Sequence, residues 1–206
     1  MRSLRELNQE VQNKTPEEII AWAFKFSQRT LTSTTFGNKS AELLHMVTRQ
    51  HPRATILWID TGYNTPATYR FAEKLIQALN LNMQVYVPEI TTVRRNVIMG
   101  GIPNIAHPLH EEFTRQVKLE PFKRATDILD PPLWITGIRR SQSTYRESLD
   151  VISMTKSGIL KVAPFLNCQD EKIDSYLETH QLPNEPDYFD PTKVQDNREC
   201  GLHTRM

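Results

Sequence analysis

Three polar segments contain residues suited to binding an anion, and each follows a short apolar or β-branched run. The first covers residues 33–40 and has the sequence Ser-Thr-Thr-Phe-Gly-Asn-Lys-Ser. Hydroxyl groups, backbone N–H groups and a helix start favour a bound phosphate. The alternative is an ordinary strand-to-helix turn with a glycine and a capping serine. The candidate ligand residues are Thr34, Thr35, Gly37, Lys39 and Ser40.

The second segment, Asp60-Thr61-Gly62, follows the apolar run at residues 55–59. A carboxylate directly after a strand can accept hydrogen bonds from ribose hydroxyls, which makes these residues candidate nucleotide ligands. The alternative is an Asx turn, in which Asp60 bonds to the backbone and caps the next helix.

The third segment, residues 137–146, places Arg139, Arg140 and Arg146 among hydroxyl side chains. Guanidinium groups bind multiply charged oxyanions through paired hydrogen bonds, so we expect a phosphate or sulfate ligand here. The alternative is a solvated basic loop. Its position after the short apolar run at residues 133–136 favours the ligand interpretation.

Two cysteines could carry nucleophilic chemistry. Cys200 lies in a polar stretch close to the C-terminus, where Arg198 and His203 favour the thiolate and Glu199 opposes it. The alternative is a surface thiol without a role. Cys168 precedes a predicted helix and is interpreted as a packed core thiol. No metal site is predicted.

The elements that must position these residues alternate along the chain. Strands are predicted at residues 30–35, 55–59, 83–87 and 133–136, with a hairpin of 151–154 and 159–162. Helices are predicted from Pro16, and over 40–49, 65–79, 121–129 and 170–180; residues 90–117 are expected to form short helices and loops. This order indicates a parallel α/β sheet, whose ligands bind beyond the carboxyl ends of the strands. We predict one domain over residues 1–186 and a mobile polar tail over 187–206.

Composition limits the function classes. The chain has 206 residues, with 25 Lys and Arg against 24 Asp and Glu, and this balance argues against a dedicated nucleic-acid binder. No apolar run is long enough to cross a membrane, and the N-terminus lacks the apolar core of a signal peptide. The presence of only two cysteines excludes a disulfide framework, and a reducing cytoplasm is the expected compartment.

Five motifs together resemble the sulfonucleotide reductases over residues 32–203. The most specific is Glu-Cys-Gly-Leu-His at 199–203, which is similar to the catalytic motif of that family. The others are Asp-Thr-Gly-Tyr at 60–63, Lys-Leu-Glu-Pro at 118–121, the arginine segment at 137–143, and Thr-Phe-Gly at 35–37 with His45. The resemblance is greatest to the branch that reduces 3′-phosphoadenylyl sulfate.

The resemblance implies an adenine nucleotide α-hydrolase-like fold, Rossmann-like in its parallel sheet, with helices on both faces and a catalytic tail. It also implies that Cys200 attacks the sulfuryl sulfur, that an S-sulfocysteine forms, and that reduced thioredoxin or glutaredoxin releases sulfite. A homodimer is a further implication. Substrate contacts and charge stabilisation are implied for Lys118, Arg139, Arg140, Arg146 and His203.

The cysteine count selects the branch. Family members that use adenylyl sulfate and an iron–sulfur cluster carry a cysteine pair besides the catalytic thiol, so two cysteines exclude that cluster. The segment before the tail is shorter than in the family, which leaves Lys39 or Lys193 as candidates for the 3′-phosphate. The alternatives are a cluster-free adenylyl-sulfate reductase, an ATP-pyrophosphatase-type adenylating enzyme, and a non-catalytic nucleotide-binding or sulfur-relay module.

Overall fold

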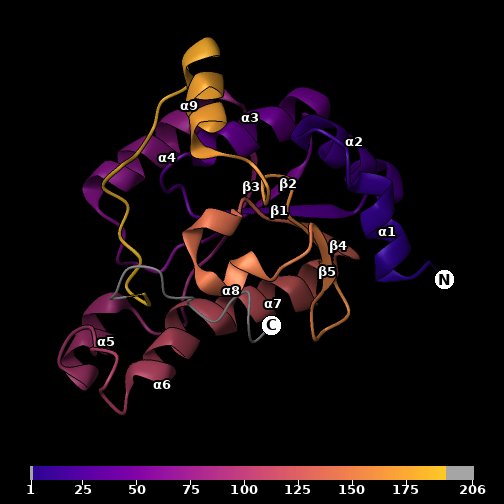
Figure 1. Ribbon diagram of the computed structural model, residues 1–206. Helices are drawn as coiled ribbons and strands as arrows, with labels where there is room; N and C mark the ends of the chain where they lie inside the picture. The colour runs from indigo at the N-terminus through magenta and orange to yellow at the C-terminus, as the bar shows by residue number, and fades with distance from the viewer. Residues whose placement is uncertain (1, 194–206) are drawn as a thin grey trace.

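The computed structural model describes residues 2–193, and these form a six-stranded sheet in the order β3-β2-β1-β4-β6-β5 (Figure 1). The strands are β1 (Thr30–Thr34), β2 (Thr55–Ile59), β3 (Asn82–Tyr86), β4 (Leu133–Ile135), β5 (Ile152–Met154) and β6 (Leu160–Val162). All neighbours are parallel except β5 and β6, which pair antiparallel with Ile152 opposite Val162. The predicted parallel α/β sheet and the hairpin are therefore confirmed.

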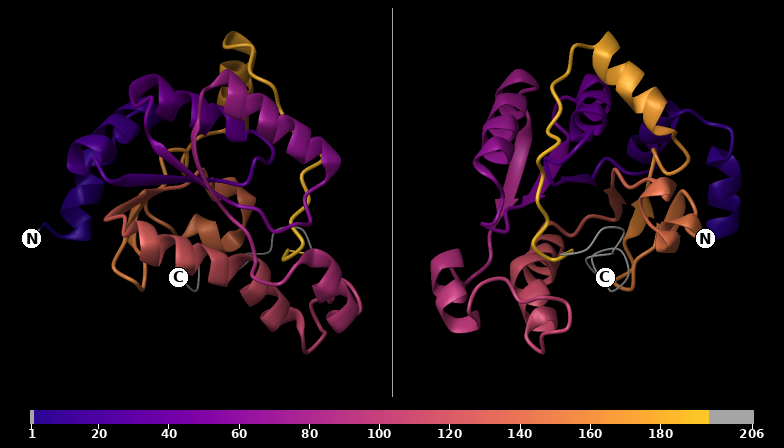
Figure 2. Two further views of the ribbon diagram at one scale, coloured as in Figure 1. Left: turned by 180° about the vertical axis from the view of Figure 1, so that it is seen from behind. Right: turned by 60° about the vertical axis from the view of Figure 1, so that its left-hand side comes forward.

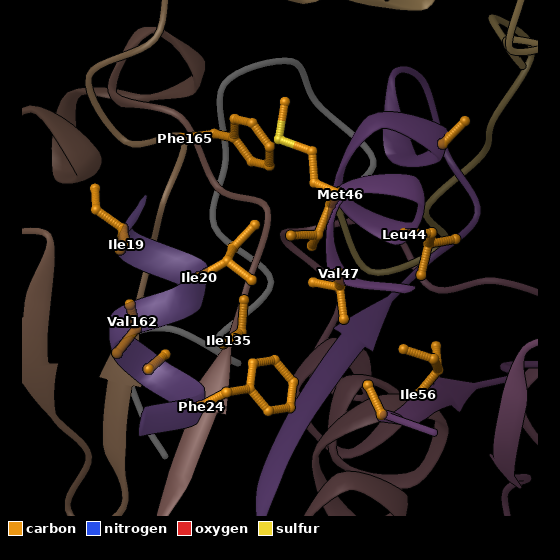
Figure 3. Packing of buried hydrophobic residues seen from close by; sticks show 14 of the residues in the cluster. Ile19, Ile20, Phe24, Leu44, Met46, Val47, Ile56, Ile135, Val162 and Phe165 are labelled. Atoms are coloured by element: carbon orange, nitrogen blue, oxygen red, sulfur yellow. The ribbon is translucent and has the colours of Figure 1, made fainter. Parts of the chain in front are cut away.

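Helices cover both faces of the sheet (Figure 2). One face carries the main core and is covered by α1 (Leu4–Val11), α2 (Pro16–Phe26), α3 (Ser40–Gln50), α4 (Pro66–Ala78) and α9 (Asp170–Thr179). Figure 3 shows part of this core, where Ile20 and Phe24 of α2 lie beside Ile135 of β4. On the other face, Phe122 and Ala125 of α7 (Glu120–Leu129) pack against Trp134.

Five further helical segments complete the described part of the chain. They are α5 (Thr92–Met99), α6 (His110–Thr114), the π-helical η1 (Arg115–Leu119), the 3₁₀ turn η2 (Arg140–Gln142) and α8 (Thr144–Glu147). None of the helices within residues 2–193 is long and apolar enough to cross a bilayer.

Local sequence explains where α2 starts. The Thr15 hydroxyl accepts a hydrogen bond from Glu18 N, the Glu18 carboxylate accepts one from Thr15 N, and Pro16 stands at the first helical position. This capping box confirms the predicted start. Helix α1 has a similar capping box between Ser3 and Glu6, but no element was predicted there.

A second difference concerns the helix that carries Lys118. We predicted a helix from residue 121, but α6, η1 and α7 follow one another without a break from His110 to Leu129. Pro121 has no N–H to continue the α-helical ladder, and the wider π-helical turn lies directly before it. The proline therefore follows a bulge inside a long helical run instead of starting a helix.

The predicted boundary at residue 186 stays a prediction, because most of the proposed tail lies outside the described residues.

Candidate functional site

The topology creates a cleft between two of the three predicted segments. The chain moves outward from β1 to β2 and β3 on one side, and returns through β4 to β6 on the other. Ligands of open parallel sheets bind at such a switch point, beyond the carboxyl ends of the strands. A cleft of about 500 Å³ lies there, lined by the residues after β1 and after β4. Of the predicted ligands it is lined by Thr34, Thr35, Gly37, Lys39, Ser40, Lys118, Arg139 and Arg146.

The loop after β1 has an unusual backbone. Phe36 and Lys39 both have positive φ, at 50° and 62°, and Lys39 is the N-cap residue of α3. Ser40 is the first helical residue, so it does not cap the helix as our alternative interpretation had it. Its buried Oγ has no hydrogen-bond partner among the described residues. The loop therefore offers the cleft a helix start and an unsatisfied hydroxyl.

Gly37 is required by a close approach. A Cβ at this position would lie 2.8 Å from the Cγ of Tyr188, closer than two carbons can approach. Tyr188 belongs to the segment after α9, and it lines the same cleft. Glycine therefore allows that segment to pack directly on the loop after β1.

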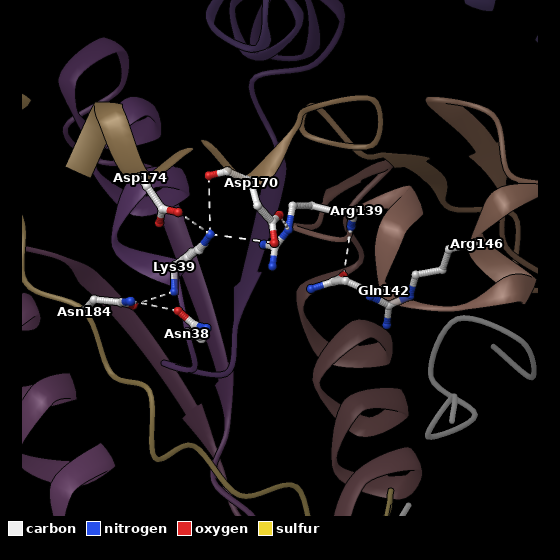
Figure 4. Close-up of polar contacts among 8 residues, drawn as sticks. All are labelled: Asn38, Lys39, Arg139, Gln142, Arg146, Asp170, Asp174 and Asn184. Atoms are coloured by element: carbon white, nitrogen blue, oxygen red, sulfur yellow. Dashed lines mark hydrogen bonds and ion pairs between the residues drawn. The ribbon is translucent and has the colours of Figure 1, made fainter. Parts of the chain in front are cut away.

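Two cations of the cleft are paired with carboxylates of α9 (Figure 4). Lys39 Nζ lies 2.9 Å from Asp174 Oδ2 and 3.7 Å from Asp170 Oδ2. Arg139 Nε lies 2.9 Å from Asp170 Oδ1, an ion pair whose N–H is not aligned for a hydrogen bond. Asp170 thus links the loop after β1 to the arginine segment after β4.

A third cation, Lys118, forms a buried ion pair. Its Nζ lies 2.5 Å from Asp190 Oδ2, and the two side chains are only 6% and 5% exposed. Burial acts to raise the pKa of Asp190, but the charge and hydrogen bond of Lys118 and the hydrogen bonds of Thr192 outweigh it and lower the pKa. Asp190 is therefore ionised at neutral pH.

Two of the three predicted arginines line the cleft, and the third does not. Arg139 and Arg146 are buried and line the cleft, and Arg146 Nη1 donates to Gln142 Oε1. Arg140 does not line the cleft. Its guanidinium donates to the carbonyls of Glu147 and Leu149 and to the side chain of Asn167. Arg140 therefore stabilises its own loop and ties that loop to the segment after β6.

The segment after β2 does not line the cleft either. Asp60 Oδ1 accepts from Gly62 N at 3.0 Å, from Asn64 Nδ2 at 3.0 Å and from the Tyr69 hydroxyl at 2.7 Å. The Asx turn of the alternative interpretation is therefore confirmed, and Gly62 has the φ of +76° that favours glycine. The expected capping of the next helix by Asp60 is wrong, because Thr65 is the N-cap residue of α4. Thr61 lines a small hollow next to the cleft, together with Lys118 and Tyr188.

The cleft also contains residues that sequence reasoning missed. Glu42 is only 4% exposed, and burial raises its pKa to about 7 against the lowering effect of Arg139. The sequence did carry a signal for Glu42, because this carboxylate stands in the run 41–44 of α3, whose other residues are apolar and buried. The missed residues Gln142, Tyr188 and Asp190 carried no local signal.

The two cysteines differ in what the structure describes. Cys168 packs against the main core, which confirms the interpretation of a packed thiol. Burial, followed by the nearby Glu42 carboxyl, raises the pKa of Cys168 to about 11. The predicted catalytic residues Cys200 and His203 lie outside the described residues.

A larger open hollow of about 700 Å³ lies at the opposite edge of the sheet, beside the amino ends of β1 and β2. None of the predicted ligand residues lines it. Because open parallel sheets bind their ligands at the carboxyl ends, we place the functional site at the smaller cleft.

Comparisons with known proteins agree on one family. Residues 29–190 match the model of the phosphoadenosine phosphosulfate reductase domain. A protein of Synechococcus sp. named phosphoadenosine 5′-phosphosulfate reductase is 35% identical and covers 98% of this chain and 97% of its own length. A protein of the same name from Proteus mirabilis is 33% identical, covering 98% of this chain and 92% of its own length.

Solved structures show the same fold. The phosphoadenylyl-sulfate reductase of Candida auris, solved as a phosphate complex, has a TM-score of 0.77 at 24% identity and covers 90% of each chain. The FMN adenylyltransferase of Candida glabrata has a TM-score of 0.60 at 16% identity, covering 88% of this chain and 58% of that chain. The predicted adenine nucleotide α-hydrolase-like fold is thereby confirmed. The chain belongs to the phosphoadenosine phosphosulfate reductase domain family.

Proposed function

We propose that the chain reduces 3′-phosphoadenylyl sulfate to sulfite and adenosine 3′,5′-bisphosphate, the reductive step of sulfate assimilation. The observation that carries the proposal is the cleft at the switch point between β1 and β4. There, Lys118, Arg139 and Arg146 lie with the loop after β1, in a chain of this family. Cations and a helix start together suit a ligand with two phosphates and a sulfuryl group.

The proposed chemistry is a displacement at sulfur. The thiolate of Cys200 attacks the sulfuryl sulfur, a new S–S bond forms, and the bond from sulfur to the bridging oxygen breaks. That oxygen leaves with its electron pair as a phosphate oxygen of adenosine 3′,5′-bisphosphate. Lys118, Arg139 and Arg146 would stabilise the charge that develops there, and His203 would favour the thiolate.

A dithiol protein completes the cycle. One of its thiolates attacks Cys200 Sγ, and sulfite leaves with the electron pair of the S–S bond. Its second thiol then resolves the mixed disulfide, so that the partner is oxidised and Cys200 becomes a thiol again. We propose thioredoxin or glutaredoxin in this role, and a homodimer as the assembly. A reducing cytoplasm would keep Cys200 competent.

The 3′-phosphate requires a further cation. Lys39 and Lys193 were the sequence candidates, and both line the cleft. Lys39 is already paired with Asp174 and Asp170, so its charge is largely compensated. We therefore assign the 3′-phosphate to Lys193.

A sulfite-release assay tests the function. The purified chain is incubated with 3′-phosphoadenylyl sulfate and reduced thioredoxin, and sulfite is measured. A parallel reaction without reductant is analysed by intact mass and peptide mapping. We expect sulfite in the first and a sulfonate adduct on Cys200 in the second, with neither formed by Cys200→Ser. An adenylating enzyme or a binding module would release no sulfite.

A further inference from the structure

The segment 184–193, called the strap below, crosses from α9 on one face of the sheet to the helices on the other (Figure 2). It is attached at three points. Asn184 Oδ1 accepts from Lys39 N at 2.7 Å, while Asn184 Nδ2 donates to Asn38 Oδ1 at 2.8 Å. The Tyr188 ring packs over Gly37, and Asp190 pairs with Lys118.

The third attachment, between Asp190 and Lys118, has the most hydrogen bonds and is buried. Asp190 Oδ2 accepts from Lys118 Nζ at 2.5 Å, and Asp190 Oδ1 accepts from Thr192 N at 3.0 Å and from Thr192 Oγ1 at 2.6 Å. Both carboxylate oxygens are therefore occupied, and both charged side chains are buried. Lys118 lies in the π-helical turn, a type of bulge that recurs at functional sites.

This pair is unfavourable for binding a polyanion. A buried carboxylate that touches a cation of the cleft opposes any phosphate or sulfate that approaches the same cation. Asp190 therefore weakens the attraction of the cleft for its proposed substrate. The Asp190–Lys118 pair thus opposes binding of the anion, yet both oxygens of Asp190 are hydrogen-bonded. This combination suggests that the pair serves to hold the chain in place.

The pair holds the chain at a point shortly before Cys200. Asp190 stands ten residues before Cys200, and ten residues of extended chain span at most about 35 Å. The attachment at Lys118 therefore fixes the point from which the cysteine-bearing segment starts. We propose that Asp190 is a positioning residue, which ties the segment leading to Cys200 to Lys118 and so sets the approach of the thiol to the sulfuryl group. This inference rests on the proposed function.

The test compares Asp190→Asn with Asp187→Asn, the same chemical change at an exposed position of the strap. Two quantities are measured: the affinity for adenosine 3′,5′-bisphosphate by calorimetry, and the single-turnover rate of sulfonate formation on Cys200 at saturating 3′-phosphoadenylyl sulfate without reductant. For Asp190→Asn we expect unchanged or tighter nucleotide binding, because a repelling charge is lost. We expect adduct formation to slow by roughly tenfold to a hundredfold, since small misplacements cost that much. Asp187→Asn should match the unaltered chain in both.

Several results would overturn the inference. An unchanged adduct rate would leave Asp190 without a positioning role, and a faster rate would make it an autoinhibitory contact that substrate displaces. Weaker nucleotide binding with an unchanged saturated rate would make it a binding residue. If the unaltered chain forms no adduct, the proposed function itself fails, which is a separate outcome.

Two controls show whether the variants fold: thermal unfolding of each variant, and a second variant of the same contact. Thr192→Val removes the hydroxyl that donates to Asp190 Oδ1 while both charges remain. We expect a smaller slowing of adduct formation with unaltered nucleotide affinity. If Asp190→Asn does not fold, this variant decides the question, and an unchanged adduct rate in it refutes the inference.

Discussion

Arg139 and Arg140 are adjacent in sequence, and the structure predicts opposite effects for their replacement by alanine. The sequence predicts that both arginines bind a phosphate or sulfate. The structure places Arg139 in the cleft beside Asp170, and directs Arg140 to backbone carbonyls of its own loop. Replacing each residue in turn therefore tests the site assignment with a matched control.

The expected size for Arg139→Ala follows from its charge. A preorganised donor to a developing anion contributes about 2–4 kcal/mol to catalysis. Asp170 already compensates part of the Arg139 charge, so we expect the lower half of this range, a loss of roughly 30- to 160-fold in turnover. The Asp170 side chain is 47% exposed and can be solvated, so the unfolding free energy should fall by about 1 kcal/mol or less.

For Arg140→Ala we expect the opposite result, a loss of stability with little change in turnover. The change removes hydrogen bonds to Glu147 O, Leu149 O and Asn167 Oδ1. Each such bond contributes about 0.5–1.5 kcal/mol, and partial exposure reduces the sum to about 2 kcal/mol. In a chain of this size that lowers the Tm by roughly 4–8 °C. Turnover below the Tm should stay close to that of the unaltered chain.

Sulfite release and thermal unfolding are measured on both variants. If Arg140→Ala lost turnover as strongly as Arg139→Ala at an unchanged Tm, the placement of Arg140 outside the site would be wrong. If Arg139→Ala lowered the Tm but kept its turnover, the arginine segment would be a structural loop.

Three further predictions follow from the cysteines and the buried glutamate. The purified chain should show no iron–sulfur absorption and should turn over 3′-phosphoadenylyl sulfate faster than adenylyl sulfate; equal or better turnover of adenylyl sulfate would contradict this. Cys168→Ala should retain sulfite formation, because the pKa of about 11 keeps that thiol protonated; an internal Cys168–Cys200 disulfide formed without reductant would refute this. The pKa of Glu42 is raised to about 7 in the folded chain, so folded Glu42 keeps a proton between about pH 4.5 and 7 that the unfolded chain releases. The stability of the unaltered chain therefore falls as pH rises through this window. Glu42→Gln should therefore gain stability relative to the unaltered chain between pH 5 and pH 8 in denaturant titrations, by about 3 kcal/mol at most, and parallel pH profiles would exclude the shift.

Most of the fold could be predicted because its signals are local. The buried run at 55–59 and the capping box at Thr15 each depend on a few neighbouring residues. Helix α1 has the same local start signal, a capping box between Ser3 and Glu6, but its apolar pattern is weak because only Leu7 and Val11 of its eight residues are buried. It docks through Asn8, whose side chain accepts from Ile152 N and donates to Ile152 O on the edge strand β5. That partner is far away in the sequence, so no local pattern indicates where the helix docks.

The candidate site was predictable only in part, for a similar reason. The sequence indicates which loops follow strands, and two of the three predicted loops line the cleft. It leaves the Asx turn of Asp60 as one of two interpretations without deciding between them, and it does not indicate that neighbouring arginines diverge. The counter-ions are equally hidden, since Asp190 is 72 residues from Lys118 and Asp174 is 135 residues from Lys39.

The pairing of charges has a consequence for how the cleft can bind a polyanion. Among residues 2–193, five cationic side chains line it, namely Lys39, Lys118, Arg139, Arg146 and Lys193. Buried cations are costly without partners, and the carboxylates of Asp170, Asp174 and Asp190 supply three of the compensating charges. Long-range attraction is therefore largely cancelled, and affinity must come from short-range contacts at fixed positions. Two of these carboxylates belong to α9 and the third to the strap, so an anion that contacts their cations must change the energy of this part of the chain. By linkage, the position of the segment that leads to Cys200 must in turn change the affinity for the anion.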